Sequence, residues 1–278
     1  MADVFNAKEK NWDVTANRFV AFFDILGFKD FVLKHPHEFV LDKITLLKNA
    51  RRYAVDGFAT DGKKVMNTNL KSFQFSDSFF VFTATDSAED FLNLLFLSRV
   101  LLSSSYSQKI PLKGAISYGK ITADFENSIF VGQPIIDAYV LHEDLYMLGA
   151  ILDHNVEKKI KEFQTLPLVK NVIDYEFNEQ LSNEIVRYKT PSKSGQVNYY
   201  CLKWPLIVSP DTLNRGEFLL HTFTRFQFEN FYTTVSGKAR IYIDNTLDFI
   251  DYLIEKAKKE HPKIKEFRVP YQFHPTGE

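Results

Sequence analysis

The sequence has almost no cysteine and almost no net charge, and each shortage excludes a class of protein. A single cysteine, Cys201, cannot form an intramolecular disulfide or build a cysteine-based zinc site. The 34 Lys and Arg residues against 35 Asp and Glu leave a formal charge of −1, which argues against non-specific binding to nucleic acid or to a membrane surface. We therefore expect no nucleic acid and no membrane among its partners.

Long apolar runs are absent as well. The N-terminus lacks the apolar core of a signal peptide. The most apolar helical stretch, Phe91 to Leu102, is interrupted by polar residues and is too short to cross a bilayer. The sequence carries no nucleophilic serine or cysteine triad, P-loop or dinucleotide-binding fingerprint. With 278 residues, 45% of them hydrophobic, we expect a cytoplasmic protein with one large domain or a core with an extension.

The order of the expected elements predicts an α+β fold. A strand from Phe19 to Ile25 precedes a helix from Asp30 to about Asp56. Residues 73–83 alternate around Asp77 as a β-hairpin would, and a helix over residues 87–105 follows. A strand from Leu112 to Ile121 completes a β-α-ββ-α-β unit, which is typical of a ferredoxin-like, palm-type core with an antiparallel sheet and flanking helices.

Further elements follow this unit. We expect a short strand at Ile129–Val131, a helix from Gln133 to Leu148 and a strand from Ala150 to Asp153. Gly114 and Gly119 lie inside the preceding strand, where glycine often marks the close approach of a ligand to the backbone.

The chain divides into three expected parts. Residues 1–16 form a flexible N-terminus, residues 17–165 a catalytic core, and residues 166–278 an α/β extension that packs on the core. Within the extension we expect, in order, a loop, two strands and a helix capped near Asn245, at residues 190–196, 197–202, 206–209 and 246–259.

Two aspartates stand inside apolar strands. Asp24 interrupts the run from Arg18 to Phe28, and Asp77 interrupts the run from Phe73 to Phe82. Aspartate is depleted in strands and is rarely buried without a partner. Either residue alone could be a strand-end aspartate satisfied by backbone amides. The first strand and the hairpin of a β-α-ββ unit are adjacent, however, so the pair predicts a magnesium or manganese site that binds substrate phosphates.

The surrounding residues carry a resemblance to a known family. The segment Phe22-Phe-Asp-Ile-Leu-Gly-Phe28 resembles the first metal motif of the class III nucleotide cyclases. Ser76-Asp77 falls where that family has Gly-Asp, and Lys113-Gly-Ala-Ile-Ser-Tyr-Gly119 resembles the strand that follows. Val131-Gly132 and the helix after it are similar to the next segment, so the resemblance covers roughly residues 18–153.

The resemblance implies a site and an assembly. It implies two divalent ions, Mg²⁺ or Mn²⁺, bound by Asp24, Asp77 and the carbonyl of Ile25. It also implies a homodimer whose sites lie across the subunit interface. The substrate would be a nucleoside triphosphate whose phosphates are cradled by the amides of Leu26, Gly27 and Phe28.

Departures from the family concern the base and the transition state. The Lys that reads adenine in adenylate cyclases is replaced by Phe73, and the second base-reading position falls on Gln133. The Asn and Arg that act on the ribose and the transition state would fall on Ile136 and Val140. A bulky Phe73 favours a smaller ring. The pattern resembles the bacterial Pycsar-type pyrimidine cyclases, antiphage enzymes that make cyclic UMP or cyclic CMP.

The expected reaction is attack of the ribose 3′-hydroxyl on the α-phosphate of UTP or CTP, and a separate effector protein would read the product. Lys113 is the first candidate to oppose the phosphate charge and Arg99 the second. Asp137 could contact base or ribose, and His142 is expected to cap or pack near its helix end. Two alternatives stay open: a purine cyclase with unusual base contacts, and a catalytically silent cyclase-like domain that binds a nucleotide or a partner.

Overall fold

The computed structural model describes residues 12–56, 59–60, 63–64, 69–165, 173–205 and 236–260. The chain divides into two compact units, Met1–Trp204 and Pro205–Glu278. The first unit holds the sheet and the predicted site, and the described part of the second is chiefly the helix α9 (Lys238–Glu260). None of the helices in these described stretches is both long enough and apolar enough to cross a membrane.

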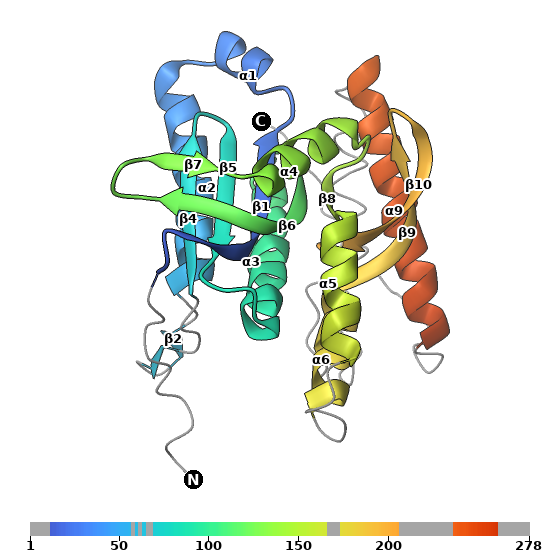
Figure 1. Ribbon diagram of the computed structural model, residues 1–278. Coiled ribbons are helices and arrows are strands. Elements are labelled where there is room, and N and C mark those ends of the chain that lie inside the picture. The colour runs from blue at the N-terminus through green and yellow to red at the C-terminus, as the bar shows by residue number, and fades with distance from the viewer. Residues whose placement is uncertain are drawn as a thin grey trace. The chain divides into compact units, whose positions relative to one another are not determined.

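An eight-stranded sheet runs through the first unit, with β1 (Thr15–Ile25) in its interior (Figure 1). The strands pair in the order β4-β5-β1-β6-β8-β10-β9, and β7 pairs with β6. All of these pairs are antiparallel except β6 with β8. The predicted α+β fold is confirmed, because the first strand lies between the hairpin and the last strand of a β-α-ββ-α-β unit. The other strands are β4 (Leu70–Phe75), β5 (Ser78–Thr83), β6 (Leu112–Asp124), β7 (Ile129–Val131), β8 (Gly149–Leu152), β9 (Ile185–Ser192) and β10 (Gly195–Leu202), while β2 (Ala59–Thr60) and β3 (Lys63–Lys64) form a separate pair.

Helices cover both faces of the sheet. Phe19 of β1 stacks on Phe91 of α3 (Ala88–Ser107), with the ring centroids 4.6 Å apart. Phe22 meets Tyr139 of α4 (Gln133–Asp144) on the other face, because residues an odd number apart on a strand point to opposite sides. Because side chains two residues apart on a strand point to the same side, the carboxylate of Asp24 lies on the same face as Phe22, which is the α4 face. Two further helices of this unit are α5 (His154–Thr165) and α6 (Ile173–Glu184).

One expected helix is divided in two. In place of a single helix from Asp30 to Asp56, the chain forms α1 (Phe28–Lys34) and α2 (His37–Asp56). Pro36 explains the break, because proline lacks the amide hydrogen of a helical residue and disfavours the helical conformation in the residue before it. His35 is accordingly extended, with φ −127° and ψ 150°.

The sheet reaches beyond the expected core at both ends. Thr15 and Ala16, assigned to the flexible segment 1–16, already belong to β1. At the other end β9 and β10 join the sheet through β8, although they lie in the stretch expected to form an extension. The loop expected at residues 190–196 is wrong: those residues form the facing ends of β9 and β10 around a tight turn.

The expectations for the C-terminal part are only partly met. The strand expected at residues 197–202 is confirmed within β10. The strand expected at residues 206–209 lies outside the described residues. The helix expected from Thr246 begins earlier, at Lys238, so Asn245 lies inside it and does not cap it.

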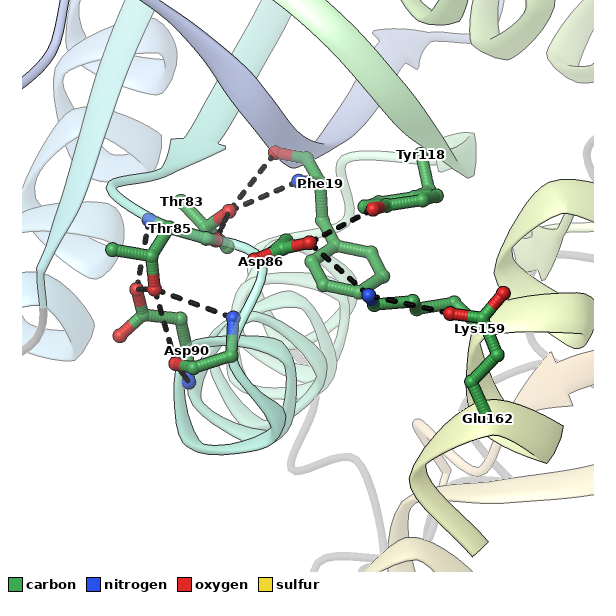
Figure 2. A network of polar contacts seen from close by, with 9 residues as sticks. Phe19, Thr83, Thr85, Asp86, Asp90, Tyr118, Lys159 and Glu162 are labelled. Carbon is green, nitrogen blue, oxygen red and sulfur yellow. Dashed lines mark hydrogen bonds and ion pairs between the residues drawn. The ribbon is translucent and has the colours of Figure 1, made fainter. Parts of the chain in front are cut away.

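A polar network fastens α5 to the sheet on the α3 face (Figure 2). Asp86, in the loop before α3, accepts hydrogen bonds from the hydroxyl of Tyr118 on β6 at 2.9 Å and from the Nζ atom of Lys159 on α5 at 3.1 Å. Lys159 also pairs with Glu162 one turn later, at 3.4 Å. We call these four residues the Asp86 network. Its ion pair joins parts of the chain 73 residues apart in the sequence.

Candidate functional site

Asp24 and Asp77 lie together where β1 meets the β4–β5 hairpin. Asp24 is the penultimate residue of β1, and Asp77 is in the two-residue turn between β4 and β5, as the sequence predicts. The hydroxyl of Ser78, the first residue of β5, donates a hydrogen bond of 2.9 Å to Oδ1 of Asp24. The charge of Asp77 is near enough to raise the pKa of Asp24. The two carboxylates therefore converge at one edge of the sheet.

The positive charge near Asp24 does not offset the cost of burying its carboxylate. Burial raises its pKa to about 6 from a usual 3.8, with a smaller upward contribution from Asp77. The hydrogen bond from Ser78 and the charge of Lys113 lower the pKa, but they do not offset the burial. A perturbed carboxylate in a partly open position is typical of a site that binds a cation or a substrate.

Lys113 is brought next to Asp24, but its ammonium has an internal partner. It faces Asp24 across the β1–β6 ladder and is 4% exposed. Its Nζ atom donates to the carbonyl oxygen of His142 at 3.1 Å, which ties the end of α4 to β6. Burial lowers the pKa of Lys113. The other candidate, Arg99, is not near this carboxylate group: it lies on α3, and its Nε atom pairs with Glu184 at 3.0 Å.

His142 belongs to the neighbourhood of Asp24, which the sequence analysis did not anticipate. Its Nε2 atom lies 3.7 Å from Oδ2 of Asp24, and the side chain is 1% exposed. Burial and the charge of Lys113 lower the pKa of His142 to about 4. The signal was present in the spacing: Pro134, Ala138 and His142 repeat every four residues and form the buried face of α4.

The expected phosphate-binding turn is only partly available. The amide of Leu26 donates to the carbonyl of Pro111 at 2.8 Å, so it is used within the protein. Gly27 is exposed and has a φ of +77°, a conformation that favours glycine, and α1 begins at Phe28. Ile25 ends β1 directly after Asp24, so its carbonyl lies at the same edge of the sheet.

Phe73 shares the sheet face of Asp24, but its ring packs against another phenylalanine. It pairs with Phe80 across the hairpin, and Phe80 pairs in turn with Phe22 of β1. Its ring lies 4.7 Å from that of Phe130 next to the β6–β7 turn, measured between centroids. Contact of Phe73 with a base stays a prediction.

Gln133 and Asp137 line an open cavity of about 700 Å³ at the outer side of α4. The side-chain amide of Gln133 donates to Oδ1 of Asp137 at 2.7 Å. Ile136 and Val140, where the cyclase family has its Asn and Arg, line the same cavity, and Lys193 of the β9–β10 turn is on its rim. The two predicted base-contacting residues are therefore together, on the same helix as His142.

The glycines of β6 serve packing between protein segments. A Cβ atom at Gly114 would lie 2.3 Å from the carbonyl oxygen of Phe22, and one at Gly119 would lie 2.9 Å from the ring of Pro134. The expectation of a ligand is wrong for Gly114, where β1 fills the space. Gly119 also lines a cavity of about 340 Å³ with Gln133 and Asp137, so for this residue the expectation stays a prediction.

Metal-binding side chains are not gathered into large groups in the part of the chain that the structure describes. Within it, no group of three or more His, Cys, Asp or Glu residues is arranged to hold a metal ion. An ion at Asp24 and Asp77 would therefore take much of its coordination from substrate and water, as magnesium commonly does.

Comparisons with known proteins give distant likenesses. No protein-family model matches the sequence, and neither does any curated protein. Among solved structures, the chain is similar to a bacterial light-regulated adenylyl cyclase (TM-score 0.43, 11% identity, 76% of this chain and 98% of that chain) and to the adenylyl cyclase CyaB from P. aeruginosa (TM-score 0.40, 13% identity, 71% and 98%). Another is the catalytic core of a rhodopsin-guanylyl cyclase with converted specificity in complex with ATPalphaS (TM-score 0.41, 10% identity, 68% and 96%). Likenesses this distant decide neither activity nor substrate, which depend on the residues of this chain.

Proposed function

We propose that this chain is a class III-type nucleotidyl cyclase that converts UTP or CTP into cyclic UMP or cyclic CMP. The observation that carries the proposal is the convergence of Asp24 and Asp77 at the end of a buried strand, beside Ser78. Such carboxylates are the ligands that Mg²⁺ or Mn²⁺ takes from a protein when substrate phosphates and water complete its coordination.

The residues around Asp24 suit a pair of divalent ions. Asp24, Asp77 and the Ile25 carbonyl would hold them. A bound cation would offset the cost of burying the ionised carboxylate of Asp24, the cost that raises its pKa. When bound, such ions lower the barrier to attack by a hydroxyl and neutralise the leaving pyrophosphate.

The proposed reaction is an intramolecular displacement. The 3′-oxygen of the ribose forms a bond to the α-phosphorus, and its proton passes to solvent water. The bond from that phosphorus to the oxygen bridging to the β-phosphate breaks, and pyrophosphate leaves. The amides of Gly27 and Phe28 are the candidates to bind the phosphates. Lys113 would act from within the protein, by holding the end of α4 next to Asp24.

Base selection would depend on Phe73, Gln133 and Asp137. The aromatic side chain at residue 73 cannot donate the hydrogen bond with which a lysine reads adenine, and it leaves less room for a purine. Gln133 and Asp137, joined by their own hydrogen bond, offer a donor and an acceptor at the cavity. A pyrimidine edge presents such polar groups, which favours UTP or CTP.

An apolar stripe on α4 supports a homodimer. Ile136, Tyr139 and Val140 lie on one helical face and are 56%, 51% and 58% exposed. Ile129 and Val131 of β7, just before α4, are 51% and 60% exposed. A second copy of the chain that covers this surface would bring its residues to the cavity beside it. The cyclic product would be read by a separate effector protein in the cytoplasm, as part of an antiphage response.

The test is a product assay. Purified protein is incubated with manganese and each of the four ribonucleoside triphosphates, and products are identified by mass. A cyclic pyrimidine monophosphate supports the proposal. A cyclic purine or a linear product would replace it with a different nucleotidyl transfer. A folded protein that binds a nucleotide without turnover would support the alternative of a catalytically silent binding domain.

Asp77→Ala is the decisive variant. Product formation should fall at least about a hundredfold, a loss typical when a charge-stabilising group is removed from an active site. Since Asp77 is in a surface turn, thermal unfolding should change little. Ser76→Ala, on the same turn, is the matched control and should keep its activity. Normal turnover of the Asp77→Ala variant would contradict the carboxylate pair.

A further inference from the structure

His142 has a buried ring nitrogen that the proposed reaction leaves without a role. The side chain is 1% exposed, and among the described residues Nε2 has no hydrogen-bond partner. The nearest charged atom recorded for it is Oδ2 of Asp24, at 3.7 Å. Burying a polar atom without a partner costs stability, so an unsatisfied nitrogen next to a candidate site calls for a ligand.

The other ring nitrogen decides what Nε2 can bind. Nδ1 lies 3.2 Å from the carbonyl oxygen of Tyr139 and 3.8 Å from Oε1 of Glu143. A carbonyl and a carboxylate only accept hydrogen bonds, so Nδ1 carries the ring proton. The side chain is 1% exposed, and burial disfavours the charged form of the ring. Nε2 therefore presents a lone pair to the carboxylate of Asp24.

Two acceptors that face each other are satisfied by a hydrogen-bond donor or a cation between them. A separation of 3.7 Å is too long for a direct hydrogen bond. Two ligand atoms that are each about 2.1 Å from the same ion lie at most about 4.2 Å apart, so Nε2 and Oδ2, at 3.7 Å, can both bind one ion with an angle of roughly 120° between the two bonds. A hydrogen bond from the other ring nitrogen to a backbone carbonyl is the usual support of a metal-bound histidine.

The ring is also held in this direction. The Phe22 ring packs edge-on against it, with centroids 4.8 Å apart. Lys113 donates to the carbonyl oxygen of His142 itself, which fixes the end of α4. Nε2 therefore already faces Asp24 before any ligand binds.

We propose that His142 is a metal ligand through Nε2, that it shares a divalent ion with Asp24, and that this nitrogen makes the site prefer a first-row transition ion to magnesium. The inference rests on the proposed function, which places an ion at Asp24. Magnesium favours oxygen ligands and gives up water reluctantly, whereas imidazole suits transition metals. Manganese is the probe, because its unpaired electrons report directly bound nitrogen.

The test is pulsed electron paramagnetic resonance of Mn²⁺ bound to the full chain, prepared without added histidines and in a buffer without nitrogen ligands. The unmodified protein should show coupling of the ion to an imidazole nitrogen. His142→Gln should remove this coupling and weaken Mn²⁺ binding at least about tenfold, with a smaller loss for Mg²⁺ measured by calorimetry. His37→Gln, an exposed histidine at the start of α2, is the matched control and should retain the coupling.

Two results would overturn the inference. One is that the unmodified protein binds Mn²⁺ and Asp24→Asn does not, while the bound ion shows no imidazole coupling. The other is an unmodified protein that does not bind Mn²⁺. The unmodified protein is informative even if His142→Gln fails to fold. The proposed function fails separately: imidazole coupling without any cyclic product would retain the ligand and reject the cyclase, and a cyclic product without the coupling would do the reverse.

Discussion

Two groups of charged side chains lie on opposite faces of the same sheet, and their charges are balanced differently. In the Asp86 network, opposite charges meet at 3.1 Å. Burial there pushes the pKa of Asp86 up, but hydrogen bonds from Lys159 and Tyr118 outweigh it and hold the pKa below its usual value. Next to α4, burial instead raises the pKa of Asp24 to about 6 and lowers that of His142 to about 4.

The difference separates a structural ion pair from a candidate binding site. The Asp86 network already contains its cation, so its charges stabilise the fold. Burial drives Asp24 and His142 toward their neutral forms; the charge of Lys113 does not offset this at Asp24 and adds to it at His142. Lys113 is nearby, but it is bonded to the carbonyl of His142. Perturbed groups without internal compensation are the pattern of a functional site.

The substitution with the largest expected effect is Asp24→Asn, which tests whether the charge of Asp24 is uncompensated. Turnover should fall at least about a hundredfold, because the charge that would hold an ion is lost. Stability should rise. The pKa of Asp24 is about 6 in the folded chain against 3.8 unfolded, and one pKa unit corresponds to about 1.4 kcal/mol, so its ionised form opposes folding. Because the side chain is 24% exposed and loses the charge on its hydrogen bond with Ser78, we expect only part of the corresponding ~3 kcal/mol, a gain of about 1–2 kcal/mol in the free energy of unfolding at pH 7.5.

The gain should depend on pH in one direction. Below about pH 3 Asp24 is largely protonated in both states, because this is well below its pKa of 3.8 in the unfolded chain, so the variant and the unmodified protein should differ little. The gain should grow as pH rises from 4 to 6 and stay constant above that. Urea unfolding across this range is the measurement. Asp42→Asn, at an exposed site of α2, is the control, and a loss of stability in Asp24→Asn would contradict the absence of compensating charge.

Asp86→Asn should have the opposite effect on stability. It removes the ion pair with Lys159, in which Asp86 is 41% exposed, so we expect a loss of about 1 kcal/mol. Because the pKa of Asp86 is lowered in the folded chain, this loss should be full near neutral pH and disappear in acid. Turnover should stay within about twofold. A large loss of activity with normal stability would mean that the network belongs to the site.

The smallest expected effect is that of Tyr118→Phe. It removes one hydrogen bond to Asp86 and keeps the ring that packs on Phe19. We expect a loss of about 0.5–1 kcal/mol in urea unfolding, without a change in turnover. A loss larger than that of Asp86→Asn would show that the hydrogen bond from the tyrosine hydroxyl, and not the ion pair, holds α5 to the sheet.

Local patterns predicted most of the strands and helices up to residue 153, but not the helix α5 that follows. Alternating apolar residues on both sides of Asp77 require a hairpin, and Ser87 accepts a hydrogen bond from the amide of Asp90 as a helix cap should. The hairpin at residues 190–196 was not predicted, since its Thr, Pro, Ser and Gly residues resemble a loop, although they pair between the adjacent strands β9 and β10.

The sequence by itself determined the β-α-ββ-α-β order and the two aspartates that interrupt its strands, because both depend on neighbouring residues and on the two-residue period of a strand. Only the tertiary structure decided what surrounds them. It placed His142 3.7 Å from Asp24, engaged Lys113 and the Leu26 amide within the protein, and moved Arg99 to a pair with Glu184. The physical reason is that burial and charge balance depend on contacts between elements far apart in the chain, on which local periodicity carries no information.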